Sequence, residues 1–138
     1  MVLNYDLHIH TWISPDAAIN PIKVSEIAKK RGLNGIAITD HNTIKGGLIA
    51  KSKNSNPEFL IIVGAEIKTE IGDIIGLFLS QEILIHKADK VIEEIRNQGG
   101  VAILAHPFKG NYGIESNLID QIDAIEVANG RLKRKKNL

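Results

Sequence analysis

The sequence predicts an α/β fold in which parallel strands alternate with helical crossovers. Strand-like and helix-like segments follow one another along the chain of 138 residues. Most strand-like segments are apolar at nearly every position, which is typical of strands buried on both faces of a parallel sheet. Hydrophobic residues make up 43% of the sequence and aromatic residues only 4%. We therefore expect one domain, residues 1–138, with an aliphatic core.

Six segments have the composition of strands. The first alternates polar and apolar residues, whereas most of the later ones are continuous apolar runs. The third and fourth segments flank a short turn at 69–72, which predicts a hairpin. The six segments are residues 4–10, 35–39, 59–67, 73–79, 101–105 and 124–128.

Four segments have helical signals. Asn20 and Pro21 are typical of an N-cap and a first helical position, and Gly32 ends the apolar spacing that follows them. The third segment is amphipathic and ends before Gly99 and Gly100. The four segments are residues 20–32, 43–51, 87–97 and 116–122.

Composition argues against several classes of protein. The 17 basic and 16 acidic residues leave a net charge of +1, so no general attraction to nucleic acid or membranes is expected. The absence of cysteine excludes disulfides and thiolate metal sites. No apolar run approaches the ~18 residues of a membrane span, and no signal-peptide pattern opens the sequence. We expect a cytoplasmic protein whose basic segment 131–136 is a solvated helix start.

Four of the five histidines lie where predicted strands end. His8 and His10 end the first strand, His41 follows the second, Glu66 ends the third, and His106 follows the fifth. The carboxyl ends of parallel strands meet at one face of a sheet. Imidazole and carboxylate are the usual ligands of zinc, manganese and iron. These residues therefore predict a metal site that activates water for hydrolysis.

Other polar residues near strand ends are further candidates. Asp40 precedes the histidine after the second strand, and His41 and Asp40 are the catalytic candidates: Asp40 could orient a ligand or accept a proton. His86 lies at a strand–helix junction, fits no cluster and is interpreted as an ordinary polar residue. Three residues just past strand ends could bind a substrate phosphate or be solvated surface residues: Lys109, Asn129 and Arg131.

Four ordered motifs resemble the polymerase and histidinol phosphatase (PHP) superfamily of metal-dependent phosphoesterases. They are Asp6-Leu-His-Ile-His-Thr11, Thr39-Asp-His-Asn-Thr43, Gly64-Ala-Glu66 and Ala105-His-Pro107. Residues 123–131 resemble the strand before the last motif of the family. The resemblance spans nearly the whole chain. It implies a distorted (β/α)₇ TIM-like barrel with two or three divalent ions, zinc, manganese or iron, at its carboxyl face.

The resemblance also implies three groups of ligands, in which one glutamate is shared by the first two ions. The groups are His8, His10 and Glu66; Glu66 and His106; and Asp16 and His41. Asp73 stands where family members often have a histidine. It is open whether Asp73 is a ligand that changes the metal preference or an ordinary turn residue.

The final Asp-x-His motif of the family is absent before Leu138. A closed barrel of this type needs roughly 200 residues, so we expect a C-terminally incomplete barrel with an exposed apolar edge. Either the sequence is a fragment or another chain, such as a second copy, covers that edge.

The sequence thus predicts a metal-dependent phosphoesterase acting through metal-activated water on a phosphate mono- or diester. The expected substrate is a phosphorylated small molecule or a nucleotide, and the near-neutral charge disfavours a long nucleic acid. Two alternatives stay open. One is another metal-dependent hydrolase, of the amidohydrolase type. The other is a non-catalytic metal-binding or assembly domain, because the last motif is missing.

Overall fold

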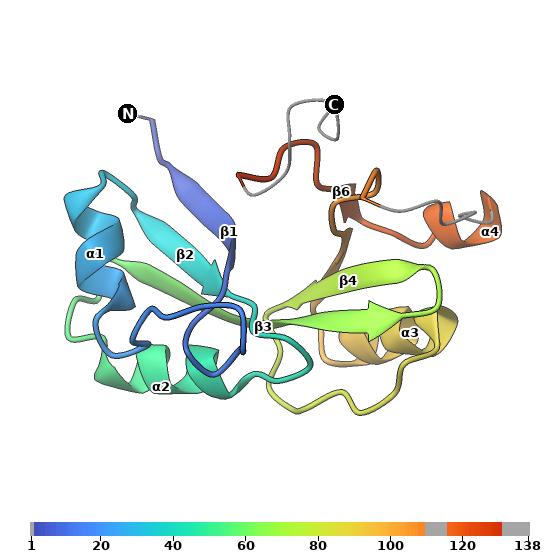
Figure 1. The fold of residues 1–138 in the computed structure, drawn as a ribbon, viewed down its shortest axis with the longest axis horizontal. Helices are drawn as coiled ribbons and strands as arrows, with labels where there is room; N and C mark the ends of the chain where they lie inside the picture. Colours follow the sequence, from blue (N-terminus) through green and yellow to red (C-terminus); the bar gives the residue numbers. More distant parts are fainter. Residues whose placement is uncertain (1, 110–115, 131–138) are drawn as a thin grey trace.

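The computed structural model describes residues 2–109 and 116–130. A six-stranded sheet, in the order β1-β2-β3-β4-β5-β6, curls into an open half-barrel (Figure 1). The strands are β1 (Tyr5–Ile9), β2 (Gly35–Ile38), β3 (Leu60–Thr69), β4 (Gly72–Leu77), β5 (Val101–Leu104) and β6 (Ala124–Ile125). The helices are α1 (Val24–Lys30), α2 (Lys45–Lys53), α3 (Ala88–Asn97) and α4 (Ser116–Ile119). The predicted α/β class is confirmed.

The sheet is mixed and not uniformly parallel. β1, β2 and β3 are parallel neighbours, as are β5 and β6, but β4 is antiparallel to both β3 and β5. The predicted hairpin is confirmed and closes between Thr69 and Gly72, where Gly72 has a φ of 122° that favours glycine. The predicted parallel sheet with helical crossovers therefore does not extend to β4, because this tight turn reverses the chain and β4 is antiparallel to β5 as well.

Several element boundaries differ from the predicted ones for local reasons. α1 begins at Val24 because Asn20 Oδ1 accepts the Ile22 N–H at 2.9 Å, which makes a turn before the helix. α2 begins at Lys45 because the Glu82 carboxylate accepts the Ile44 N–H at 3.0 Å at its start. The sixth strand is much shorter than residues 124–128, and α4 ends at Ile119.

Helices pack on the sheet through two apolar clusters. The buried side chains of α3 recur at helical spacing, Ala88, Val91, Ile92 and Ile95, and they pack against Ile74 of β4. Burying each such isoleucine contributes about 1.5–3 kcal/mol. The second cluster joins α1 and α2 to β2 and β3; it contains Val24, Ala28, Ile36, Ile38, Ala50, Phe59 and Ile61. These contacts fix the strands whose ends carry the candidate site.

The two terminal strands leave apolar side chains in solvent. Tyr5 and Leu7 of β1 are 42% and 40% exposed, and Ile125 and Val127 at β6 are 43% and 55% exposed. The expected apolar edge at the last strand is therefore present in the described part of the chain, and β1 leaves a second one that was not predicted. Within the same residues, no helix combines the length and the apolar character needed to cross a bilayer.

Candidate metal centre

The histidines predicted at strand ends converge on one buried glutamate. His8 lies in β1 and His10 directly after it, His41 follows β2, and His106 follows β5. Glu66 lies within β3, not at its end as expected, because β3 continues into the hairpin. β3 leaves its β2 partner after Val63 and contacts the segment beyond β2 instead, where the Glu66 N–H donates to the Asp40 carbonyl oxygen at 3.1 Å.

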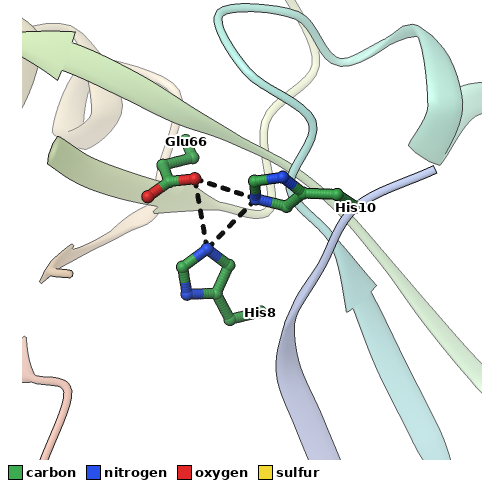
Figure 2. Close-up of side chains that lie close together, drawn as sticks. All are labelled: His8, His10 and Glu66. Carbon is green, nitrogen blue, oxygen red and sulfur yellow. Dashed lines mark hydrogen bonds and ion pairs between the residues drawn. The ribbon is translucent and has the colours of Figure 1, made fainter. Parts of the chain in front are cut away.

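The first group of candidate ligands joins β1 to β3. Figure 2 shows His8 and His10 directed towards the same oxygen of Glu66. His8 Nε2 lies 3.2 Å and His10 Nε2 2.8 Å from Glu66 Oε2, and the two Nε2 atoms are 3.1 Å apart. The two imidazoles meet at one oxygen because residues two apart along an extended segment lie on the same face.

A second group lies on the other side of the same carboxylate. His106 Nε2 is 2.7 Å from Glu66 Oε1 and 3.4 Å from Asp73 Oδ2. Asp73 reaches this place from β4, where it pairs with Lys68, two residues beyond Glu66 along β3. The two oxygens of Glu66 therefore face different groups, which is the arrangement of a carboxylate that bridges two ions.

A third group lies nearer to solvent. His10 Nδ1 is 3.1 Å from Asp16 Oδ1, and His41 Nε2 is 3.5 Å from Asp16 Oδ2. His41 Nδ1 also lies 3.3 Å from Glu66 Oε2. His10 thus takes part in two groups, one through each ring nitrogen, which the sequence analysis did not foresee.

The donor sets fit divalent ions. In each of the three groups, the ligand atoms all lie within 4.8 Å of one another. Ligand bonds of roughly 2.0–2.2 Å around a tetrahedral ion place the ligand atoms about 3–4 Å apart, so little movement is needed. Imidazole nitrogens and carboxylate oxygens are also the donors that zinc, manganese and iron share.

Hydrogen bonds within the centre shift the pKa values of His8 and Glu66 towards their charged forms. Burial lowers the pKa of His8, but hydrogen bonds to Glu126 and Glu66 outweigh it and raise that pKa to about 9. Burial raises the pKa of Glu66, but hydrogen bonds from His10, His106 and His8 prevail and hold it far below its usual range. Because metal ligands must be deprotonated, ion binding would release the protons of the imidazoles.

Asp40 accepts the hydrogen bonds of a buried network beside the centre. Its carboxylate is fully buried and accepts three hydrogen bonds, from Thr11 N–H (2.7 Å), Thr11 Oγ1 (2.8 Å) and Ser14 Oγ (3.0 Å). Ser14 Oγ in turn accepts the His41 N–H at 2.8 Å. This network ties the loop after β1 to the end of β2. Both oxygens of Asp40 contact this network, and Asp40 belongs to none of the three ligand groups.

A cavity of about 580 Å³ opens over the centre. Candidate ligands from all three groups line it, together with Lys109, Asn129 and Glu126. The Asn129 side-chain amide donates to both oxygens of Glu126, at 3.1 and 3.2 Å. Arg131 lies outside the described residues.

Sequence reasoning missed Glu126. Its carboxylate accepts hydrogen bonds from His8 Nδ1, at 2.9 Å, and from the His106 N–H, at 2.8 Å. Its position just after β6 could have indicated it, because the histidines were chosen as candidates for their positions at strand ends. His86 lies apart from the three groups, with Nδ1 3.0 Å from the Lys68 carbonyl oxygen, in keeping with its interpretation as an ordinary polar residue.

The fold and the converging ligands define a curled α/β half-barrel with a candidate multi-ion centre at one end. The model of the PHP domain family matches residues 6–136. The chain therefore belongs to the PHP domain family, as the sequence motifs indicated.

Two proteins of Methanocaldococcus jannaschii are similar to this chain in sequence. The chain is 41% identical over 114 residues to the uncharacterized protein MJ1587, an alignment that covers 75% of this chain and 67% of that protein. It is 30% identical over 142 residues to the uncharacterized protein MJ0417, covering 95% of this chain and 54% of the relative. The chain thus spans about two thirds of one relative and about half of the other.

Solved structures with low sequence identity share the fold. A two-domain protein from Bacteroides vulgatus containing a predicted PHP-like metal-dependent phosphoesterase matches 94% of this chain and 45% of its own, with a TM-score of 0.79 and 22% identity. An amidohydrolase from Chromobacterium violaceum with bound sulfate and no metal matches 96% of this chain and 80% of its own, with a TM-score of 0.72 and 18% identity. These likenesses concern the fold alone.

Proposed function

We propose that the protein hydrolyses phosphate esters with divalent ions held by the three groups of ligands. The observation that carries the proposal is the orientation of Glu66, whose two oxygens face separate groups, towards His8 and His10 on one side and His106 on the other. A pair of divalent ions would lower the pKa of a bound water molecule. It would also stabilise negative charge on the phosphoryl oxygens. Membership of the PHP domain family supports the same reaction class.

The residues of the chain would divide the work. His8 and His10 with Glu66 would hold the first ion, Glu66 with Asp73 and His106 the second, and His10, Asp16 and His41 the third. The His41 side chain is 33% exposed, so a substrate oxygen could reach this member of the centre from solvent. Lys109 lines the cavity and would add positive charge against a phosphate.

The cavity favours a small substrate. Its volume of about 580 Å³ lies within the range of roughly 300–1,000 Å³ that is typical of small-molecule pockets. The net charge of +1 gives no general attraction to a long polyanion. We propose a phosphorylated small molecule or a nucleotide as the substrate.

Metal binding will stabilise the fold measurably. At a free Mn²⁺ or Zn²⁺ concentration 100-fold above Kd, linkage adds about 2.7 kcal/mol, which raises the Tm of a domain of this size by roughly 10 °C. Differential scanning fluorimetry of metal-free protein with each ion measures the shift, and a chelator should reverse it. His10→Ala, which removes a member of two groups and leaves the second intact, should show a smaller shift.

The reaction class is tested with metal-loaded protein and a panel of phosphate monoesters, diesters and nucleotides. Metal-dependent release of phosphate or of the alcohol supports the proposal. A panel of amides and lactones is run beside it, because one structural neighbour is named an amidohydrolase. Cleavage of an amide or lactone with no turnover of any phosphoester would overturn the proposal.

Asp73 sets the preference of the second group for its ion. The group contains two carboxylates and one imidazole, a donor set richer in oxygen than the other two. Oxygen donors suit manganese better than they suit zinc. Asp73→His should therefore raise the occupancy of zinc relative to manganese by on the order of 10-fold, within the range that changes in a metal environment produce.

This preference is measured by metal analysis after dialysis against equal concentrations of both ions. Asp120→His is the matched control, because Asp120 is exposed and belongs to none of the three groups. An unchanged zinc-to-manganese ratio in Asp73→His would show that Asp73 is a residue of β4 with no part in metal binding.

A further inference from the structure

Among the described residues, a carboxylate connects the two ends of the open sheet. β1 and β6 are the terminal strands, and no strand pairing joins them in the described ranges 2–109 and 116–130 (Figure 1). Nevertheless, His8 of β1 and Glu126, directly after β6, are in contact although 118 residues separate them. The contact bridges β1 and the segment after β6 at the end of the half-barrel that carries the candidate centre.

Glu126 holds the ring nitrogen of His8 that does not face the centre. His8 Nε2 points at Glu66, whereas Figure 2 shows the other ring nitrogen on the far side of the imidazole. That nitrogen, Nδ1, lies 2.9 Å from Glu126 Oε1. When Nδ1–H donates to this carboxylate, the lone pair of Nε2 is left to face an ion, and the plane of the ring is fixed.

The same carboxylate also holds the second group. Glu126 Oε2 accepts the His106 N–H at 2.8 Å. His106 has a φ of 29°, in a region that residues with side chains rarely adopt, so its backbone needs such an external hold. The Asn129 amide donates to both oxygens of Glu126 and steadies it in turn.

We propose that Glu126 is a positioning residue that joins β1 to β6 and sets the distance between the first and second ion groups. The inference rests on the proposed function, because the positioned groups are those that would bind the ions. Its test does not require the protein to be active. Removing the carboxylate would free the His8 ring and the His106 backbone together. Both groups would then weaken, although no candidate ligand has been changed.

The test compares the full-length chain carrying Glu126→Ala or Glu126→Gln with the unchanged protein. Glutamine has a single acceptor oxygen for two donors, so it should retain part of the effect. We expect the affinity for Zn²⁺ or Mn²⁺ alone, measured by calorimetry, to fall 10- to 100-fold in Glu126→Ala and less in Glu126→Gln. Glu58→Ala is the matched control, because Glu58 is exposed and outside the centre.

A second readout does not depend on metal. Long-range ¹⁵N–¹H spectra of the imidazoles report the His8 Nδ1–H, which should move or vanish in Glu126→Ala and persist in the control. Amide hydrogen exchange in β1 should accelerate about 10-fold or more. If Glu126→Ala does not fold, Glu126→Gln decides by the same measurements.

The outcomes separate the inference from the proposed function. Unchanged metal affinity with an unchanged His8 Nδ1–H signal in Glu126→Ala would overturn the inference. Weakened metal binding and a displaced signal support it, even if the unchanged protein hydrolyses no phosphoester, a result that would count against the proposed function alone.

Discussion

Under the proposed function, we expect Glu66→Gln to lower phosphoester hydrolysis by on the order of 1,000-fold or more. Glu66 is the carboxylate on which His8, His10 and His106 converge, and it is 1% exposed. The glutamine side chain has one oxygen, whereas the two oxygens of Glu66 face two ligand groups. The ions would therefore lose their shared ligand. Ion-mediated charge stabilisation is worth several kcal/mol, and each 1.36 kcal/mol changes the rate tenfold.

The measurement combines kcat/KM on the best phosphoester with metal content after gel filtration. Glu58→Gln, the same change at an exposed position, is the control. Circular dichroism of both variants checks that the fold persists. Turnover within about threefold of the unchanged protein, with metal content retained, would remove Glu66 from the centre.

Asp40→Ala will destabilise the fold by about 3–5 kcal/mol. The change leaves three buried donors, on Thr11 and Ser14, without their acceptor, and each such loss costs roughly 1–3 kcal/mol before the hydroxyls find new partners. Urea unfolding measures the difference. Asp120→Ala, at an exposed position, should change the free energy of unfolding by less than about 0.5 kcal/mol.

Two further variants separate the effect of the hydrogen bonds to Asp40 from the effect of its negative charge. Asp40→Asn keeps one acceptor oxygen and should lose less stability than Asp40→Ala. Gly46→Ala leaves Asp40 intact, but its new Cβ would overlap with Asp40 Oδ2 and crowd Thr11 Oγ1, so it should weaken the same hydrogen bonds. Full stability in both Asp40→Ala and Gly46→Ala would show that the network is not needed for folding.

Much of the architecture was predictable because local patterns coincide with the fold. The apolar runs placed the strands, and the turn at 69–72 predicted the hairpin that the structure contains. The hairpin implies that β4 is antiparallel to β3, but the antiparallel pairing of β4 with β5 was not predicted. The composition of a strand indicates whether it is buried, and a buried strand can have parallel or antiparallel neighbours. The direction of the strand depends on how the connecting segment crosses the sheet.

The sequence by itself determined which residue types could meet, because histidines after apolar strands must gather where the strand ends gather. The tertiary structure decided how they meet. It placed Glu66 inside β3 with its two oxygens facing different groups, and it turned Asp40 away into a buried network. It also brought Glu126 to His8 from the opposite end of the sheet. Sheet curvature brings these distant residues together, and no local sequence pattern encodes that curvature.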